Sequence, residues 1–410
     1  MYSGSKTSRE GAEETPANRP GPPRLLYSFP HVLDRPGIAN TALNQVTSLA
    51  RLGVPITLFC ASVGNATLPS TVTVHETLSL KGNRIPHRAI GVQRAYSYHD
   101  WVVSKWLAKN ATSIDLVHAW PRGCLRTLMT ARTFGIPGLR EAPNPHTASA
   151  FRENAAAAAD AGTIVSKQDS HAALRGVLRR ETAEFDAAKY ILVPSDYCRN
   201  EFIGEGIARE KLLQHRYGCD IAIFDNPRPD SKEDKTFRAV FVGSGGPRKG
   251  LHVALAAWKQ ASLQDASLVV AGTLDSEYAR SLHDYLQMDT VEHIGFVADV
   301  AGLMAQSDVL MLPSWTEGSA LVTFEAQASG CVPLVSVASG ALGLPGRDYL
   351  SHSVGDSDSL AQQLAELATN RGRLAELSQH CISQRDNLTW DQAAARLLDC
   401  YETAVATCRT

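Results

Sequence analysis

Two glutamates that lie eight residues apart, Glu317 and Glu325, are the residues of this chain whose spacing suggests chemistry most directly. They follow an apolar run at 309–312 that predicts a strand, and a Gly-Ser-Ala turn separates them. The glycine lets the backbone approach a ligand, and the free N–H groups of the next helix favour a phosphate. Carboxylates accept hydrogen bonds from hydroxyls, such as those of a sugar or a ribose. A helix-capping acid with one surface glutamate is the plain structural alternative.

A second candidate site is the stretch Gly-Ser-Gly-Gly-Pro-Arg-Lys-Gly at 243–250. It follows an apolar run at 238–242, so we expect a strand, a glycine-rich turn and then a helix over 249–260. Backbone amides near Ser244 and the cations of Arg248 and Lys249 would cradle a diphosphate. The stretch matches neither GxxxxGK[ST] nor GxGxxG, and such a turn is a tight connection as often as it is a phosphate site.

Two features of the N-terminal half could face the same ligand. Gly37 precedes a segment, 38–52, whose apolar residues recur at helical spacing, so the positive end of a helix dipole would lie there. His146 lies in a polar, proline-rich loop after an expected strand at 138–141. A single histidine is more often structural than functional, so its role depends on what surrounds it.

These residues are distributed over two successive strand–helix patterns. The first pattern has expected strands at 25–29, 56–59, 114–119, 138–141 and 190–193, and the second at 238–242, 268–271, 309–312 and 333–337. Alternating strands and helices predict an α/β fold with two Rossmann-like, doubly wound parallel-sheet domains facing a central cleft. Ligands bind such sheets beyond the carboxyl ends of their strands, which is where the candidate residues fall.

The two patterns set the domain limits, and the composition excludes several classes of protein. We expect a disordered leader at 1–23, domains at 24–216 and 217–389, and a final helix at 390–410. Forty basic and 42 acidic residues argue against a nucleic-acid binder, and no apolar stretch reaches the ~20 residues of a membrane span. Eight cysteines without a CxxC pair indicate neither disulfides nor a zinc site. We therefore expect a soluble cytoplasmic protein without a metal centre.

Taken together and in order, the motifs resemble the retaining glycosyltransferases of family four. The resemblance covers about residues 24–405 and rests on the 243–250 turn, the glutamate pair and the junction Tyr-Gly-Cys-Asp at 217–220. It implies the GT-B fold, with an N-terminal acceptor domain, a C-terminal donor domain and a final helix that packs back on the first domain. It also implies transfer of a sugar from a nucleoside-diphosphate sugar to an acceptor hydroxyl, with retention, in glycan, glycolipid or polysaccharide biosynthesis.

The resemblance also assigns roles to individual residues. Glu317 would contact the donor sugar, Lys249 the diphosphate and His146 the region of sugar and acceptor, so these three are the catalytic candidates. Glu325 would hold the ribose. The other donor-binding positions implied are Gly37, Ser244, Arg248, Gly295, Phe296, Gly318, Ser319, Ala320, Leu321 and Val322. Ser244 stands where the family usually has arginine, and Arg248 is the candidate replacement. With two cations available for the diphosphate, no metal or other cofactor is expected.

Alternatives remain open at this stage. Ser244 and Ala320 depart from the family pattern, which would suit a non-catalytic nucleotide-sugar-binding scaffold, and a GT-B nucleotide-sugar epimerase is a further alternative. The acceptor could be a sugar, a lipid-linked sugar or a small molecule, and the nucleotide base is open. The segment 94–109 combines aromatics with cations and could contact anionic membranes. We favour a helix that buries Trp101, Val102 and Trp106 and turns its lysines outward.

Overall fold

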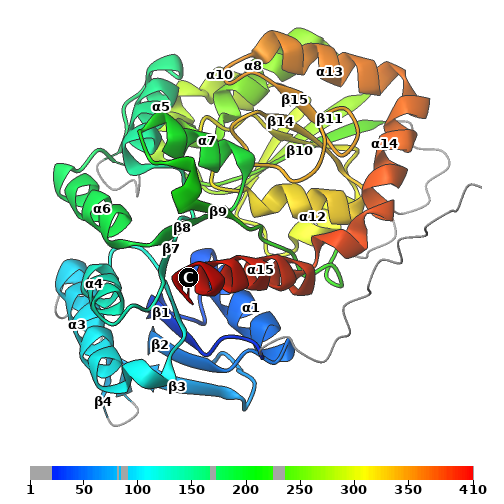
Figure 1. Ribbon diagram of the computed structural model, residues 1–410. Helices are drawn as coiled ribbons and strands as arrows, with labels where there is room; N and C mark the ends of the chain where they lie inside the picture. The colour runs from blue at the N-terminus through cyan, green and yellow to red at the C-terminus, as the bar shows by residue number, and fades with distance from the viewer. Residues whose placement is uncertain (1–20, 81–82, 85–90, 167–171, 225–235, 410) are drawn as a thin grey trace, which may run out of the picture.

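The computed structural model describes residues 21–80, 83–84, 91–166, 172–224 and 236–409. These residues form two lobes, each built on one parallel β-sheet with helices on both faces (Figure 1). The two Rossmann-like domains predicted from the sequence are therefore confirmed. The leader predicted at 1–23 lies almost wholly outside the described residues.

The first lobe contains a seven-stranded sheet with the order β3-β2-β1-β6-β7-β8-β9, in which all neighbouring strands are parallel. A short antiparallel pair, β4 and β5, lies outside this sheet. The strands of the lobe are β1 (Leu25–Val32), β2 (Ile56–Ser62), β3 (Val72–Glu76), β4 (Ser79–Leu80), β5 (Asn83–Arg84), β6 (Leu116–Ala119), β7 (Gly138–Glu141), β8 (Tyr190–Val193) and β9 (Leu212–Gln214). Its helices are α1 (Ile38–Arg51), α3 (Val92–Asn110), α4 (Leu125–Thr133), α5 (Thr147–Asp160), α6 (Arg175–Ala187) and α7 (Asp196–Gly204).

The second lobe contains a six-stranded sheet with the order β12-β11-β10-β13-β14-β15, again with parallel neighbours. Its strands are β10 (Phe237–Val242), β11 (Ala266–Ala271), β12 (Val291–Gly295), β13 (Val309–Leu312), β14 (Val332–Ser336) and β15 (Leu350–His352). Its helices are α8 (Leu251–Ala261), α9 (Ser276–Ser281), α10 (His283–Leu286), α11 (Val300–Ala305), α12 (Leu321–Ser329), α13 (Ser357–Thr369) and α14 (Arg371–Ser383).

Each sheet is buried on both faces, because successive side chains of a strand point to opposite sides. In β1, Tyr27 packs into a core shared with α1, whereas its neighbour Leu26 packs into a second core shared with α3 and α4. Pairing of β1 with both β2 and β6 places β1 at the centre of the sheet. The loops that follow β1, β6 and β7 therefore lie at one edge of the first lobe.

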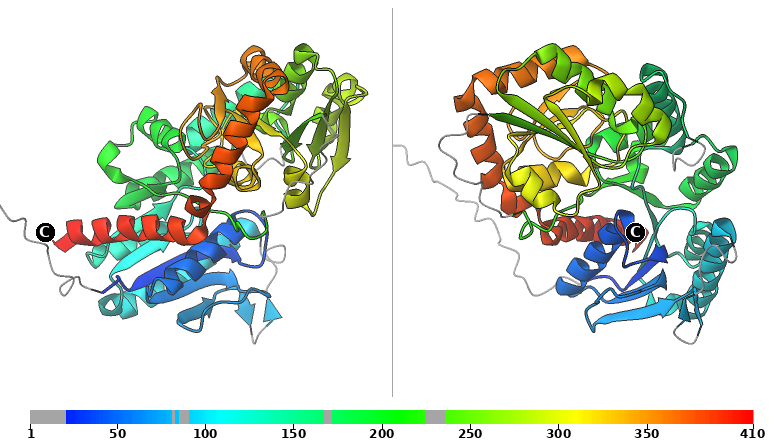
Figure 2. Two further views of the ribbon diagram at one scale, coloured as in Figure 1. Left: turned by 90° about the vertical axis from the view of Figure 1, so that its right-hand side faces the viewer. Right: turned by 180° about the vertical axis from the view of Figure 1, so that it is seen from behind.

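The last helix, α15 (Trp390–Arg409), returns from the second lobe to the first. It lies beside α1, and Leu397 and Tyr401 are buried in the core that β1 and α1 form (Figures 1 and 2). The apolar residues of α15 recur at helical spacing, so one face of the helix can be buried. The chain thus crosses between the lobes twice. None of the helices in the described ranges is both long and apolar enough to cross a bilayer.

Two local expectations differ from the structure. The helix expected over 249–260 begins at Leu251, because Gly250 has a φ of +73° and ends a 3₁₀ turn over Pro247–Lys249. Lys249 therefore lies in a turn. A Cβ on Gly250 would lie 2.0 Å from the carbonyl oxygen of Pro313, so glycine is needed where this turn meets the loop after β13.

The helix expected over 94–109 is present as α3. As expected, Val102 and Trp106 pack against the core of the lobe, each partly buried, and the lysines are exposed. Ala95, His99, Val103 and Leu107, which are four residues apart, point into the lobe. Trp101 lies off this stripe and is 43% exposed, so the expectation that it is buried was wrong.

Candidate functional site

Glu317 lies at the centre of an ionic cluster in the second lobe. Its Oε1 is 2.9 Å from Nζ of Lys249, and its Oε2 is 2.9 Å from Nη1 of Arg248. Glu317 is only 8% exposed, whereas about a fifth of the side-chain surface of each cation remains open. The structure thus brings Glu317 together with two predicted residues, Arg248 and Lys249, that lie 69 and 68 positions before it in the sequence.

The backbone around the cluster explains why these side chains meet. β10 and β13 are neighbours, so the loops after them lie side by side. The N–H of Trp315 donates to the carbonyl of Arg248 at 2.8 Å, and Nη1 of Arg248 donates to the carbonyl of Thr316 at 2.7 Å. A Cβ on Gly243 would lie 2.5 Å from Cδ of Lys249, so this glycine leaves room for the lysine stem. Arg248 therefore positions the Glu317 loop.

The two glutamates have opposite ionisation behaviour. Burial on its own raises the pKa of Glu317, but the charges of Arg248 and Lys249 outweigh it and lower this pKa to about 2. For Glu325, on α12, burial dominates and raises the pKa to about 6, with the charge of Lys249 acting in the other direction. At neutral pH Glu317 is a fixed anion, whereas Glu325 is an anion that is easily protonated.

The turn between the glutamates is anchored to the loop after β14. The N–H of Glu317 donates to the carbonyl of Ala338 at 3.0 Å, and the N–H of Ala320 donates to the carbonyl of Ser339 at 3.1 Å. The hydroxyl of Ser319 donates to the carbonyl of Gly340 at 3.1 Å. The N–H of Ala320 is therefore used within the protein.

Helix α12 begins next, at Leu321 and Val322, and no side chain from the described part of the chain caps it. The first N–H groups of a helix have no partner within it, so this end of α12 can hold an anion.

The Glu317 loop also contacts the first lobe. A Cβ on Gly318 would lie 1.9 Å from the carbonyl oxygen of Pro143, so the two lobes meet at van der Waals distance only because this residue is glycine. The hydroxyl of Ser195 donates to the carbonyl of Gly318. A third link joins Nε2 of His252 on α8 to Asp160 on α5 at 3.2 Å.

The predicted catalytic residue His146 has a structural position. Its Nδ1 accepts a hydrogen bond from the N–H of Ala148 at 3.3 Å and so caps α5, and its ring packs between Phe185 and Phe202. The side chain is 7% exposed, and burial lowers its pKa. Both the lowered pKa and the hydrogen bond that Nδ1 accepts favour the neutral imidazole.

A cavity of about 280 Å³ in the first lobe, here called the cleft cavity, lies beside His146. It is lined by Ile38 at the start of α1, just after Gly37, and by Arg122, Asn144 and Thr147. Hydroxyl, amide and guanidinium groups on its wall could hold a polyhydroxylated acceptor. Sequence reasoning selected Gly37 and His146 but missed Arg122.

Arg122 belongs to a buried charge network that the sequence did not reveal. Its Nε is 2.9 Å from Glu181, and Arg140, buried at the end of β7, lies 2.9 Å from Glu181 and 3.3 Å from Glu184. Arg122 has a φ of +67°, uncommon for a residue with a side chain. The adjacent Arg140-Glu141 pair at a strand end was the available signal.

Three further predicted residues lie at the carboxyl ends of β10 and β12 in the second sheet. The hydroxyl of Ser244 accepts from the N–H of Thr273 at 3.2 Å, which ties the glycine-rich turn to β11. The carbonyl of Gly295 accepts from the N–H of Gly272 at 2.6 Å. Phe296 follows and is 78% exposed, so its ring is available to stack on a flat ligand.

A second ionic cluster lies inside the first lobe. Oε2 of Glu141 is 3.1 Å from Nε2 of His118, and its Oε1 is 3.0 Å from Nε2 of His215. The hydroxyl of Tyr217 donates to Oε1 at 2.8 Å. Burial raises the pKa of Glu141, but His215 and His118 outweigh it and hold the pKa well below its usual range. The side chains of Glu141, His118 and His215 are inaccessible to solvent.

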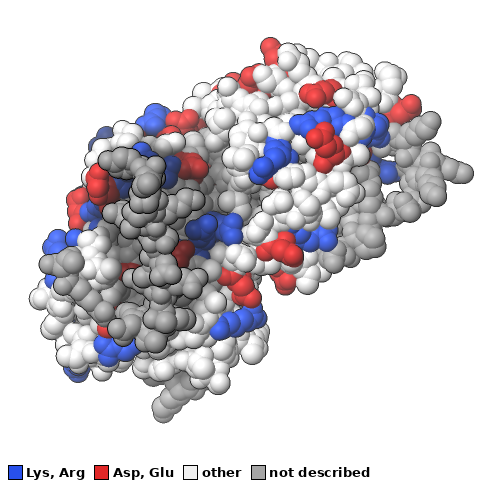
Figure 3. All heavy atoms as spheres, turned by 45° about the vertical axis from the view of Figure 1, so that its right-hand side comes forward, with Lys and Arg blue, Asp and Glu red and all other residues white. Residues whose placement is uncertain are grey.

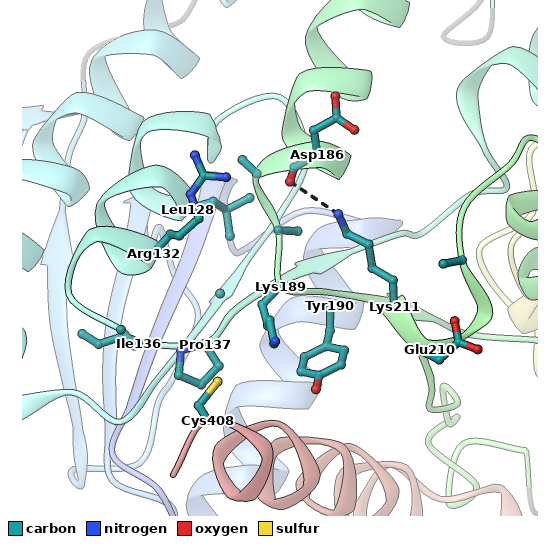
Figure 4. Close-up of a pocket in the computed structure, with 15 residues that line it drawn as sticks. Leu128, Arg132, Ile136, Pro137, Asp186, Lys189, Tyr190, Glu210, Lys211 and Cys408 are labelled. Carbon is teal, nitrogen blue, oxygen red and sulfur yellow. Dashed lines mark hydrogen bonds between the residues drawn. The ribbon is translucent and has the colours of Figure 1, made fainter. Parts of the chain in front are cut away.

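A larger cavity, of about 530 Å³, lies at the opposite edge of the first sheet, where β7 and β8 begin (Figure 4). Arg132, Lys189 and Lys211 line it, together with Cys408 near the end of α15. Nζ of Lys211 donates to the carbonyl of Asp186 at 3.4 Å. None of the predicted site residues lines this cavity.

The second lobe is similar in sequence to a known protein family. Residues 236–370 match the family described as "Glycosyl transferases group 1". Over this part of the second lobe the chain is similar to the group 1 glycosyltransferases. The resemblance inferred from the motifs is confirmed, and the match covers Lys249, Glu317 and Glu325.

Sequence relatives agree with this match. D-inositol 3-phosphate glycosyltransferase from Salinispora tropica is 26% identical over 79% of this chain and 66% of its own length, so the chain spans just under two thirds of that relative. The putative colanic acid biosynthesis glycosyltransferase WcaL from Escherichia coli is 30% identical over 52% of this chain and 58% of its own length.

Solved structures show the same fold. Sucrose-phosphate synthase from Thermosynechococcus elongatus aligns with a TM-score of 0.69 at 16% identity, covering 94% of this chain and 100% of its own. Anabaena HepE in complex with UDP aligns with a TM-score of 0.64 at 16% identity, covering 93% and 100%. The predicted GT-B fold is confirmed.

Proposed function

We propose that this glycosyltransferase moves a sugar from a nucleoside-diphosphate donor to an acceptor hydroxyl, with retention of the anomeric configuration. The observation that carries the proposal is the cluster of Lys249, Glu317 and Glu325 beside the uncapped start of α12. A cation, two carboxylates and free helix N–H groups are what a diphosphate, a sugar and a ribose require. HepE in complex with UDP and with UDP-glucose supports this donor class.

Lys249 would stabilise the charge that develops in the reaction. As the bond between the anomeric carbon and the diphosphate oxygen breaks, its electron pair moves to the diphosphate, and the sugar takes on oxocarbenium character. The acceptor oxygen attacks from the same face, and its proton passes to the departing phosphate. Neutralising the diphosphate is therefore the main task of the protein, which suits an ammonium group held in place before the donor arrives. With this cation in place we propose a reaction without a divalent metal.

The two glutamates would divide the recognition of the donor. Glu317 stays ionised because of its two cations, so it accepts hydrogen bonds from sugar hydroxyls at any physiological pH. Glu325, half-buried on α12, would accept from the ribose diol. Phe296 would stack on the base.

The acceptor would lie in the cleft cavity, whose wall includes Asn144 and Thr147. The names of the relatives, an inositol phosphate glycosyltransferase and a colanic acid glycosyltransferase, support a polyhydroxylated acceptor in glycan or glycolipid synthesis. We also propose a cytoplasmic location, where nucleotide sugars are made.

The test is release of nucleoside diphosphate from a panel of nucleotide sugars, with monosaccharides, inositol and inositol phosphate as acceptors. We expect one donor to turn over, with or without a chelator, and the product to keep the donor's anomeric configuration by nuclear magnetic resonance. Lys249→Ala should lose this turnover, and the exposed Lys259→Ala should retain it. Binding without turnover would favour the scaffold alternative, and an inverted product would contradict the mechanism.

A further inference from the structure

A cavity of about 290 Å³ lies between the two lobes, separate from the Glu317 cluster. The first lobe lines it with Ser195, His215 and Arg216, which follow β8 and β9. The second lobe lines it with Gly340, in the loop after β14, and with Tyr349. We call it the interlobe cavity. Its volume is near the lower end of the ~300–1,000 Å³ of ligand pockets, so it fits a small molecule.

One wall separates the interlobe cavity from the cleft cavity. A Cβ on Gly340 would lie 2.6 Å from the carbonyl oxygen of Gly318 and 3.0 Å from Oγ of Ser195. On its other side Gly318 abuts Pro143, which lines the cleft cavity. A ligand in the interlobe cavity would therefore contact Gly340, which packs on the loop that carries Glu317, without entering the donor or acceptor positions.

The interlobe cavity contains a cation without a counter-ion. Arg216 is half-buried, its Nε is buried with no hydrogen-bond partner, and no carboxylate of the described ranges pairs with it. Burial and the charge of Arg396 both lower its pKa, so its surroundings do not compensate its charge. Asp196 also lines the cavity, but Arg199 pairs with it. Burying an unpaired charge is costly, and an anionic ligand would relieve that cost.

Hydroxyl groups also belong to the wall of the interlobe cavity. Tyr349 and Ser351 line it, and both are half-buried. His215 borders the cavity as well, but its side chain is sealed from solvent and faces Glu141.

We propose that the interlobe cavity binds a small phosphate ester that also carries hydroxyl groups. The phosphate would pair with Arg216, and hydroxyls of the ligand would bond to Tyr349 and Ser351. Both lobes line the cavity, so the ligand binds one arrangement of the lobes best and shifts the protein toward it. This site is additional to the transfer reaction and does not depend on the donor or acceptor assigned above.

The test is calorimetric titration of the full chain with inorganic phosphate, glucose 6-phosphate and glucose. We expect glucose 6-phosphate to bind more tightly than phosphate, and glucose not to bind. Arg216→Ala should weaken glucose 6-phosphate binding about ten- to a hundredfold, the loss of one hydrogen-bonded charge. Arg209→Ala, an exposed arginine just before β9, is the matched control and should bind like the wild type.

A second variant guards against a folding defect in Arg216→Ala. Asp196→Asn removes the carboxylate of the cavity at an exposed position, so binding should become up to about fivefold tighter. Lys249→Ala should leave the binding unchanged. The proposal is overturned if no phosphate compound binds, if Arg216→Ala binds normally, or if Lys249→Ala abolishes the binding, which would place the phosphate in the donor site.

Discussion

Each lobe holds a buried glutamate between two basic side chains, but the two clusters face different surroundings. In the second lobe, Glu317 pairs with Lys249 and Arg248, whose side chains keep about a fifth of their surface open. In the first lobe, Glu141 pairs with His118 and His215, and all three are sealed from solvent. The first-lobe cluster is closed off, whereas the second-lobe cluster can exchange a protein partner for a ligand.

Charge on the face shown in Figure 3 does not distinguish the lobes. Lysine, arginine and acidic side chains alternate over the face shown in Figure 3, with no continuous field of one sign. Formal net charge is −2, so no long-range attraction selects a polyanion. Recognition of an anionic donor therefore depends on the local arrangement at Lys249 and the start of α12. The comparison teaches that accessibility, rather than the pairing of charges itself, separates a candidate site from a structural cluster.

The largest expected effect tests the sealed cluster. Glu141→Ala leaves the Tyr217 hydroxyl and Nε2 of His215 buried without an acceptor and removes the carboxylate beside His118, so we expect the free energy of unfolding to fall by about 3–5 kcal/mol. Chemical denaturation measures this loss. The exposed Glu210→Ala should change stability by less than about 0.5 kcal/mol. A similarly small loss in Glu141→Ala would show that the cluster is not structural.

The open cluster should respond in activity. Lys249→Ala removes the ammonium that meets the diphosphate, so kcat should fall by about 10²–10³. The measurement is turnover at saturating donor. Lys259→Ala provides the control because Lys259 is an exposed lysine on the adjacent helix α8. Normal turnover in Lys249→Ala would remove Lys249 from the reaction and, with it, the functional contrast between the lobes.

The contribution of Glu325 to the free energy of unfolding should depend on pH. Its pKa is raised from 4.5 to about 6 in the folded state, so ionisation opposes folding. The stability that the protonated carboxyl provides is present below about pH 4.5 and is lost as the pH rises through 6. Glu325→Gln should therefore be more stable than the wild type by up to about 2 kcal/mol at pH 8 and equal to it at pH 4. Thermal unfolding across this range decides, and a destabilised variant at pH 8 would contradict the assignment.

The smallest effect concerns the orientation of α3 in the first lobe. Trp101→Ser changes an exposed position and should alter stability by less than about 0.5 kcal/mol. Leu107→Ala, on the buried face of the same helix, should cost about 2–5 kcal/mol. Denaturant titration compares the two variants. A large loss in Trp101→Ser with little loss in Leu107→Ala would mean that the helix buries the opposite face.

The sequence predicted the second lobe better than the first for a physical reason. Glu317 and Glu325 are close in the chain, and 243–250 follows a strand that pairs with β13, so local pattern and strand order place them together. The cluster of Glu141, His118 and His215 is assembled from β7, β6 and the end of β9, and no local motif marks it. Long-range packing alone brings these residues into contact.

His146 shows the limit of a motif taken alone. Its position in the loop before α5 agrees with the family pattern, but its ring caps the helix and packs on two phenylalanines. The position of Gly250 had a similar consequence, since its left-handed conformation moved Lys249 from the expected helix into a turn. Backbone conformation and side-chain direction are set by neighbours that the sequence pattern does not display.

Calorimetric titration with UDP, GDP, ADP, dTDP and their sugar conjugates tests the central claim most directly. The account predicts that one nucleotide family binds the wild type. Glu325→Gln should lose affinity for the nucleoside diphosphate, because a neutral amide with one acceptor oxygen replaces a charged carboxylate with two. At a free concentration of 100 times its Kd, that nucleotide should also raise the free energy of unfolding by about 2.7 kcal/mol. Absence of binding by every nucleotide, or equal affinity in wild type and Glu325→Gln, would contradict it.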